Sequence, residues 1–162
     1  MTVQERQDKL VSYGKAPEQL RKALGDFPKE VWKYKPAPNR WSIHEIIIHL
    51  ADAEANCYIR ARRFVAEPGK AVMAYDQDSW AEKLGYHSQS ADAALELFGL
   101  LRRMNHGLLK SVPQDVWDSH TVEHSEVGTM TLDQFLEIYD RHTPGHIRQM
   151  QENYRHWKEH RK

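Results

Sequence analysis

Two histidines near the end of the chain are spaced so that they can share one metal ion. His142 and His146 are four residues apart, which on an α-helix places them one turn apart and about 40° apart around the axis. Imidazoles in this arrangement can chelate a single divalent ion. Both lie at one edge of the apolar stripe of their segment, so we expect them to point partly toward the core.

A third histidine has the same relation to an apolar stripe earlier in the chain. Ala53 lies one turn from His49 on nearly the same line, and its small side chain leaves space beside the imidazole. Asn56 and Arg60 continue that line, so we predict that they line a substrate or cofactor pocket. Three neutral imidazoles suit Zn, Ni, Co or Fe(II), and they leave coordination positions open, as in catalytic sites.

Carboxylates near these histidines are candidates to hold the imidazole nitrogens that do not bind the metal. Glu45 and Asp52 each lie about one turn from His49, and Asp140 lies on the last amphipathic segment. His124 precedes that segment, in a loop that we expect to reach the site, and it is a further candidate for binding substrate or cofactor. The sequence identifies no residue as the catalytic acid or base.

Two other groups have simpler interpretations. His156 and His160 repeat the four-residue spacing, but they lie off the apolar face among charged residues, which predicts a solvated tail. Cys57 lies on an apolar stripe, so we interpret it as an inert buried thiol rather than a nucleophile.

Length, charge and cysteine content exclude several classes of protein. The 162 residues fit one domain, predicted to span residues 1–162. Lys plus Arg and Asp plus Glu both number 23, which argues against a nucleic-acid partner because phosphate binding needs a basic surplus. One cysteine suits a reducing compartment. The sequence has neither a signal-peptide core nor a run of roughly 18 apolar residues, so we expect a cytoplasmic protein without a membrane partner.

Helices must position these side chains. Apolar residues recur at helical spacing over four segments, about residues 3–23, 42–65, 92–110 and 131–157. The second and fourth begin with capping boxes, S-x-x-E and T-x-x-Q. The connections at 68–90 and 111–128 are expected to be irregular, apart from a short helix at Trp80. This pattern predicts an all-α four-helix bundle with long crossover connections.

Proline and glycine residues suggest two irregularities in these helices. Gly14 and Pro17 are expected to break or kink the first helix. Pro144 lies between two candidate ligands and removes an amide donor, so we expect a kink there that helps to set the ligand geometry.

Two segments resemble the signatures of the DinB/YfiT-like metalloenzymes. Residues 41–54, WSIHEIIIHLADAE, match the pattern W-s-x-x-E-I-x-x-H-L-x-D-x-E. Residues 128–132, GTMTL, match a G-x-M-T-L loop, and residues 142–149 then supply the H-x-x-x-H-x-x-Q of the following helix. The signatures occur in the expected order, and the resemblance spans roughly residues 5–157.

The resemblance implies a four-helix bundle in which His49, His142 and His146 hold one metal ion. It also implies a homodimer and a small-molecule substrate. Some relatives are thiol S-transferases that join a low-molecular-weight thiol to an electrophile, and others are described as metal-dependent hydrolases. The leading hypothesis is therefore a thiol S-transferase that uses one divalent metal, Zn or Ni, and a low-molecular-weight thiol. The alternatives are a hydrolase that uses metal-activated water and a non-catalytic metal- or small-ligand-binding stress protein.

Overall fold

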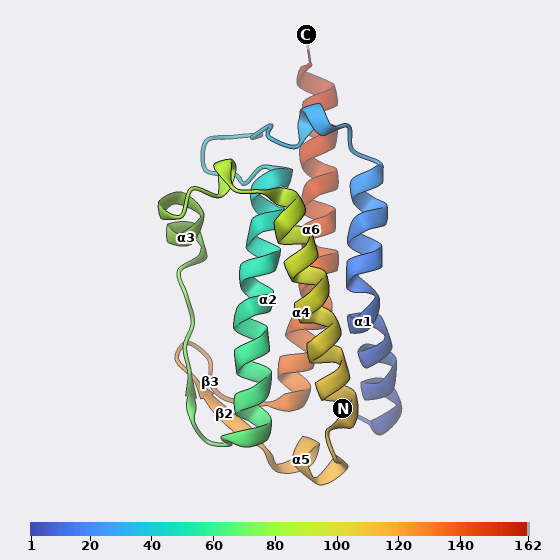
Figure 1. The fold of residues 1–162 in the computed structure, drawn as a ribbon, viewed down its shortest axis with the longest axis vertical. Helices are drawn as coiled ribbons and strands as arrows, with labels where there is room; N and C mark the ends of the chain where they lie inside the picture. The colour runs from blue at the N-terminus through green and yellow to red at the C-terminus, as the bar shows by residue number, and fades with distance from the viewer. Residues whose placement is uncertain (162) are drawn as a thin grey trace.

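Four long helices dominate the computed structural model, which describes residues 1–161 (Figure 1). They are α1 (Val3–Gly25), α2 (Ile43–Ala66), α4 (Ala91–Ser111) and α6 (Leu132–His160). α1 and α6 run in one direction, and α2 and α4 run in the other (Figure 1). α2 packs against α4 and α6, and α1 also packs against α4 and α6. The predicted four-helix bundle is therefore confirmed.

Each connection between the long helices contains short elements of its own. The link from α1 to α2 contains the 3-10 helix η1 (Lys29–Val31). Since α2 and α4 are parallel, the chain must return along the whole bundle between them (Figure 1). This crossover contains three short elements, β1 (Ala71–Val72), α3 (Gln77–Lys83) and η2 (Tyr86–Ser88). The link from α4 to α6 contains α5 (Gln114–Ser119), β2 (Thr121–His124) and β3 (Gly128–Thr131).

A small sheet replaces the irregular structure that was expected over residues 111–128. β1 pairs in parallel with β2, and β2 pairs antiparallel with β3. Strands of two and four residues are too short to produce a clear alternation in the sequence. Gly128 opens β3 with a φ of 73°, which glycine adopts without strain. The sheet ties the crossover to the link before α6.

Both predicted capping boxes are present. The Ser42 hydroxyl accepts the amide hydrogen of Glu45, whose carboxylate accepts the amide hydrogen of Ser42. Thr131 and Gln134 make the same reciprocal pair at the start of α6. These local bonds satisfy amides that the helix leaves free, which is why the helix starts could be read from sequence. None of the helices in residues 1–161 combines the length and apolarity that crossing a membrane requires.

The predicted break in α1 is wrong. The helix runs unbroken through Pro17, and Tyr13 and Leu20 on either side are buried. Gly14 instead serves helix packing, because a Cβ there would lie 2.7 Å from Cε1 of His106 on α4. α6 likewise continues through its internal proline as one helix. Tertiary packing thus outweighs the helix-breaking tendency of these residues.

Candidate metal centre

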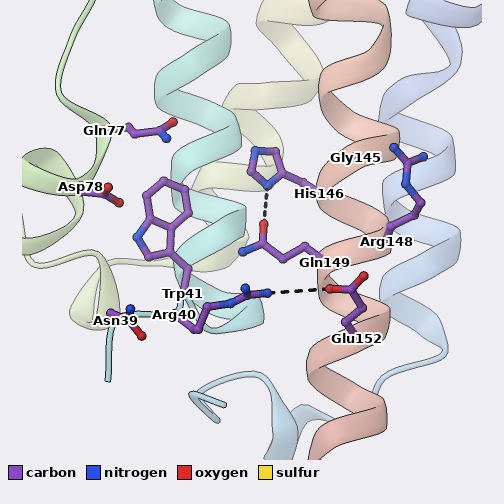
Figure 2. A pocket seen from close by; sticks show the side chains of 10 residues that line it. All are labelled: Asn39, Arg40, Trp41, Gln77, Asp78, Gly145, His146, Arg148, Gln149 and Glu152. Carbon is purple, nitrogen blue, oxygen red and sulfur yellow. Dashed lines mark hydrogen bonds and ion pairs between the residues drawn. The ribbon is translucent and has the colours of Figure 1, made fainter. Parts of the chain in front are cut away.

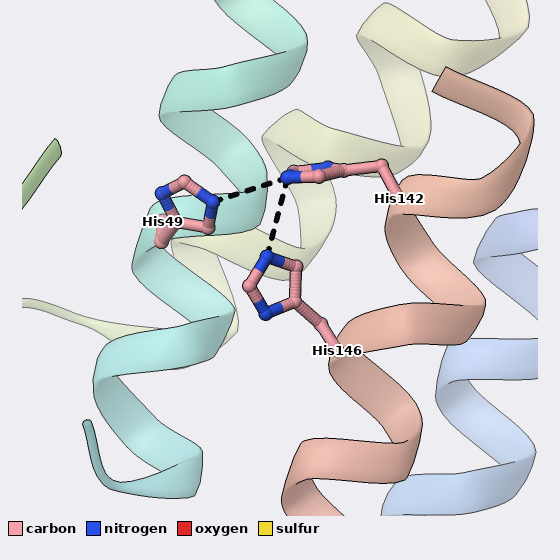
Figure 3. Close-up of side chains that lie close together, drawn as sticks. All are labelled: His49, His142 and His146. Atoms are coloured by element: carbon pink, nitrogen blue, oxygen red, sulfur yellow. Dashed lines mark hydrogen bonds between the residues drawn. The ribbon is translucent and has the colours of Figure 1, made fainter. Parts of the chain in front are cut away.

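Three imidazoles from two helices converge between α2 and α6 (Figure 3). α2 supplies His49, and successive turns of α6 supply His142 and His146. The Nε2 atom of His142 lies 3.2 Å from Nε2 of His49 and 3.2 Å from Nε2 of His146. All three candidate ligand atoms lie within 4.8 Å of one another. The structure thus brings together the three histidines that the sequence nominated.

The spacing of these nitrogens suits a shared cation better than hydrogen bonding among the rings. Nε2 of a neutral imidazole offers either one hydrogen or one lone pair, so Nε2 of His142 can serve only one of its two neighbours. A cation accepts a lone pair from each ring. Nitrogens about 2.1 Å from a tetrahedral zinc ion lie roughly 3.4 Å apart, close to the two 3.2 Å separations observed. The donor set therefore fits a divalent metal.

Burial keeps the three imidazoles in the neutral form that binds metals. Burial, and secondarily the nearby His146 ring, lowers the pKa of His49 to about 3. The pKa of His142 falls to about 2, mainly through burial and then through the other two rings. Burial also lowers the pKa of His146. Each imidazole therefore has a lone pair on one ring nitrogen at neutral pH.

Two neighbours that the sequence did not assign to the site orient its histidines. Nδ1 of His146 lies 3.0 Å from Oε1 of Gln149, so Nδ1 donates its hydrogen and Nε2 keeps its lone pair toward the cluster. The Trp41 ring centroid lies 4.7 Å from that of His49, and the Trp41 plane is within 17° of the His146 plane. Trp41 and Gln149 each match a specified residue of one of the two family signatures. The signatures could therefore have identified them as residues of the site.

Removing the hydrogen bond to His146 should weaken metal binding. Gln149→Leu is expected to reduce zinc affinity by about 10–100-fold, because the His146 ring loses its orienting acceptor. Competition with a chromophoric zinc chelator measures this change. Gln151→Leu, at an exposed position on the same helix, is the matched control and should leave the affinity unchanged. Equal affinities in the two variants would show that Gln149 does not orient the ligand.

A cavity of about 440 Å³ borders His146 and Trp41 (Figure 2). Asp78 of α3 lines it and has no cationic partner within residues 1–161, whereas Arg40 and Glu152 pair at 3.7 Å. The volume and the polar lining suit a small polar molecule. The complete lining comprises Asn39, Arg40, Trp41, Gln77, Asp78, Gly145, His146, Arg148, Gln149 and Glu152.

The three carboxylates proposed to support the histidines have other partners. Glu45 closes the N-terminal cap of α2 and pairs with Lys35 at 3.0 Å. Asp52 accepts the hydroxyl hydrogen of Tyr86, and Asp140 lies 3.8 Å from a lysine of α1. Within residues 1–161, none of these carboxylates hydrogen-bonds to an imidazole of the cluster. A position one turn from a ligand does not by itself direct a side chain toward it, because neighbouring elements compete for the carboxylate.

The other predicted binding residues also lie outside the cavity at His146. Asn56 and Arg60 line a separate cavity of about 170 Å³ between α2 and β1. Arg60 donates to the Tyr139 hydroxyl at 2.9 Å. His124 ends β2, and its Nδ1 accepts the Glu126 amide hydrogen at 3.3 Å.

The histidines of the predicted solvated tail and the predicted buried thiol have largely the surroundings expected of them. His160 is exposed, whereas His156 lies 2.6 Å from the Tyr34 hydroxyl and is half-buried. Cys57 is fully buried beside Tyr13, and this burial raises the pKa of its thiol. A buried thiol with a raised pKa is a poor nucleophile.

The chain is a helical-bundle protein with an up-down-down-up order of helices and a cluster of three histidines between α2 and α6. The chain belongs to the DinB superfamily, whose family model matches residues 13–150. The chain also resembles YfiT from Bacillus subtilis, described as a candidate metal-dependent hydrolase with an unusual four-helix bundle topology. That match has a TM-score of 0.87 at 21% identity, and it covers 96% of this chain and 89% of YfiT. It confirms the predicted fold.

Two curated relatives are named as candidate metal-dependent hydrolases. The protein of Oceanobacillus iheyensis is 27% identical over 132 residues, which cover 81% of this chain and 75% of the relative. The protein of Bacillus licheniformis is 26% identical over 132 residues, covering 82% and 75% respectively.

Proposed function

We propose that His49, His142 and His146 hold one divalent transition metal, Zn or Ni, and that the protein is a metal-dependent hydrolase of small polar molecules. The convergence of three Nε2 atoms carries the proposal. The names of the relatives favour hydrolysis over thiol transfer, which is the leading hypothesis from the sequence. A metal in this position supplies Lewis acidity and lowers the pKa of a bound water or thiol.

The residues around the cavity have separable roles in this proposal. Trp41 shields the cluster from water on one side, because its ring packs against His49 and His146. Gln149 fixes the tautomer of His146. Asp78 lines the same cavity as His146 (Figure 2). Its carboxylate can accept the proton that a water nucleophile releases in hydrolysis.

Thiol transfer is the second candidate, and one observation favours it. Within residues 1–161, no carboxylate hydrogen-bonds to the histidine cluster, so a base is not held directly beside it. A thiol needs no such base, since metal coordination deprotonates it. In this case a low-molecular-weight thiol and an electrophile would share the cavity.

Metal analysis tests the site, independently of the reaction. His49→Ala and His142→Ala are each expected to lose the bound metal that the parent protein retains after dialysis, because two imidazoles hold an ion less tightly than three. His160→Ala removes an exposed histidine and should keep full stoichiometry. Full metal retention in both ligand variants would overturn the assignment of these histidines.

Activity assays then separate the two reactions. The metal-loaded protein is expected to release product from a panel of amide and ester substrates without added thiol, and His142→Ala should lose this activity. Conjugation of a thiol to monochlorobimane, with no hydrolysis, would instead establish the transferase. Metal binding without either activity would favour the non-catalytic alternative.

A further inference from the structure

A second cavity lies on the face of α2 that carries His49. Asn56, Arg60 and Arg63 follow one another at spacings of four and three residues, so they share this face. With β1 and the residue after it, they enclose about 170 Å³. Arg60 is 11 residues from His49, which corresponds to about 16 Å along the helix axis. The cavity is therefore distinct from the one beside the histidine cluster.

Two positively charged arginines line the cavity, and among the described residues a single carboxylate lies near one of them. No acidic residue lines it, and within residues 1–161 Arg60 forms no ion pair. Its two hydrogen-bond acceptors are neutral, the Tyr139 hydroxyl and the Met73 carbonyl. Arg63 donates to the Ala71 carbonyl and approaches one half-exposed carboxylate at 3.8 Å. Since the chain has no net charge, this basic excess is a local feature.

The neutral acceptors also fix the direction of the guanidinium groups. A guanidinium has five hydrogen-bond donors in a rigid plane, and Arg60 uses only Nη1 and Nη2 in the bonds above. Fixing the side chain before a ligand arrives reduces the entropy lost on binding. Two fixed guanidinium groups are a set of donors that suits an oxyanion. The Asn56 amide beside them donates one hydrogen to the Asp52 carbonyl at 2.9 Å, which leaves its second hydrogen for a ligand.

The rim of the cavity is apolar. Ile59 and Met73 line it, and 58% and 67% of their respective surfaces are exposed. A water molecule occupies roughly 30 Å³ in the liquid, so the cavity has room for an oxyanion with part of an attached group. We infer that this cavity binds an organic oxyanion, with its carboxylate or phosphate on Arg60 and Arg63 and its apolar part on Ile59 and Met73.

Calorimetry with the full chain tests this site, using phenyl phosphate and benzoate as probes. Saturable binding is expected with a dissociation constant of about 1 mM or tighter. Arg60→Gln and Arg63→Gln should each weaken it by about tenfold or more, because each removes charge-assisted hydrogen bonds. Arg103→Gln removes the same charge at an exposed position of α4 and should change binding by less than about twofold.

The outcomes distinguish the ligand classes and separate this site from the metal centre. Binding of phenyl phosphate alone identifies a phosphate ester, and binding of benzoate alone identifies a carboxylate. His142→Ala should bind the probe as the parent does, so a failed metal centre would not affect the result. Arg60 and Arg63 both donate to backbone carbonyls of the crossover, but Arg63 is half-exposed and its replacement should leave the fold intact. Absence of binding for both probes, or an equal loss in Arg103→Gln, would overturn the inference.

Discussion

The metal-free protein is expected to lose about 5 kcal/mol of unfolding free energy between pH 6.5 and pH 4.5 through two of its histidines. Folding lowers the pKa of His49 to about 3 and that of His142 to about 2, whereas both titrate near 6.5 in the unfolded chain. The unfolded state therefore binds more protons than the folded state below pH 6.5. In that range each imidazole lowers the free energy of unfolding by about 1.4 kcal/mol for every pH unit of acidification. This contribution is complete above pH 6.5 and is lost as the pH falls.

Urea denaturation of the metal-free protein at several pH values measures the effect. The control is the double variant His49→Gln/His142→Gln, which cannot titrate at these positions and should show a much flatter dependence over the same range. Comparing slopes rather than absolute stabilities removes the constant cost of the substitutions. Equal slopes in the two proteins would mean that the folded state accommodates the charged imidazoles.

Added zinc should stabilise the parent protein at pH 7 and should leave the double variant unchanged, because only the parent binds the ion in its folded state. This comparison links the acid sensitivity to the metal centre. Burial that keeps the ligands neutral makes the metal-free fold sensitive to acid.

Features encoded within a few residues of chain were predicted well. The capping boxes at Ser42 and Thr131 and the helical spacing of apolar residues located α2 and α6. The contact of His49 with His142 and His146 depends on how two helices that are distant in sequence pack together. Helical spacing predicts only the face of its own helix on which each histidine lies. The family resemblance supplied the pairing, which the structure then shows.

The incorrect predictions concern features that depend on tertiary contacts. Glu45 belongs to the capping box and also lies one turn from His49, yet a carboxylate that is bonded to Ser42 and Lys35 is not available to hold an imidazole as well. Pro17 was expected to interrupt a helix that packing holds intact. The short strands around Val122 are specified by pairing with another segment, which a local pattern does not reveal.

Buried charge is another feature that the sequence concealed. Arg102 sits in the amphipathic pattern of α4, where an arginine is usually solvated. In the structure it is fully buried, with its Nη2 atom 2.6 Å from Oε2 of Glu54 on α2. The same carboxylate accepts hydrogen bonds from Tyr13 at 2.8 Å and Asn105 at 3.1 Å. This network joins α1, α2 and α4 and thereby holds the helix that carries His49.

Arg102→Met should therefore lower the free energy of unfolding by about 3–5 kcal/mol, because it leaves the Glu54 carboxylate buried without a cation. Urea denaturation at pH 7 measures the loss. Adding Glu54→Gln to Arg102→Met removes the uncompensated charge while keeping an acceptor for Tyr13 and Asn105, so it should restore about 2 kcal/mol or more. Additive losses in the double variant would show that the pair is not coupled. Recovery would show that the pairing of the two charges, and not either charge alone, stabilises the packing of α2, the helix that carries His49.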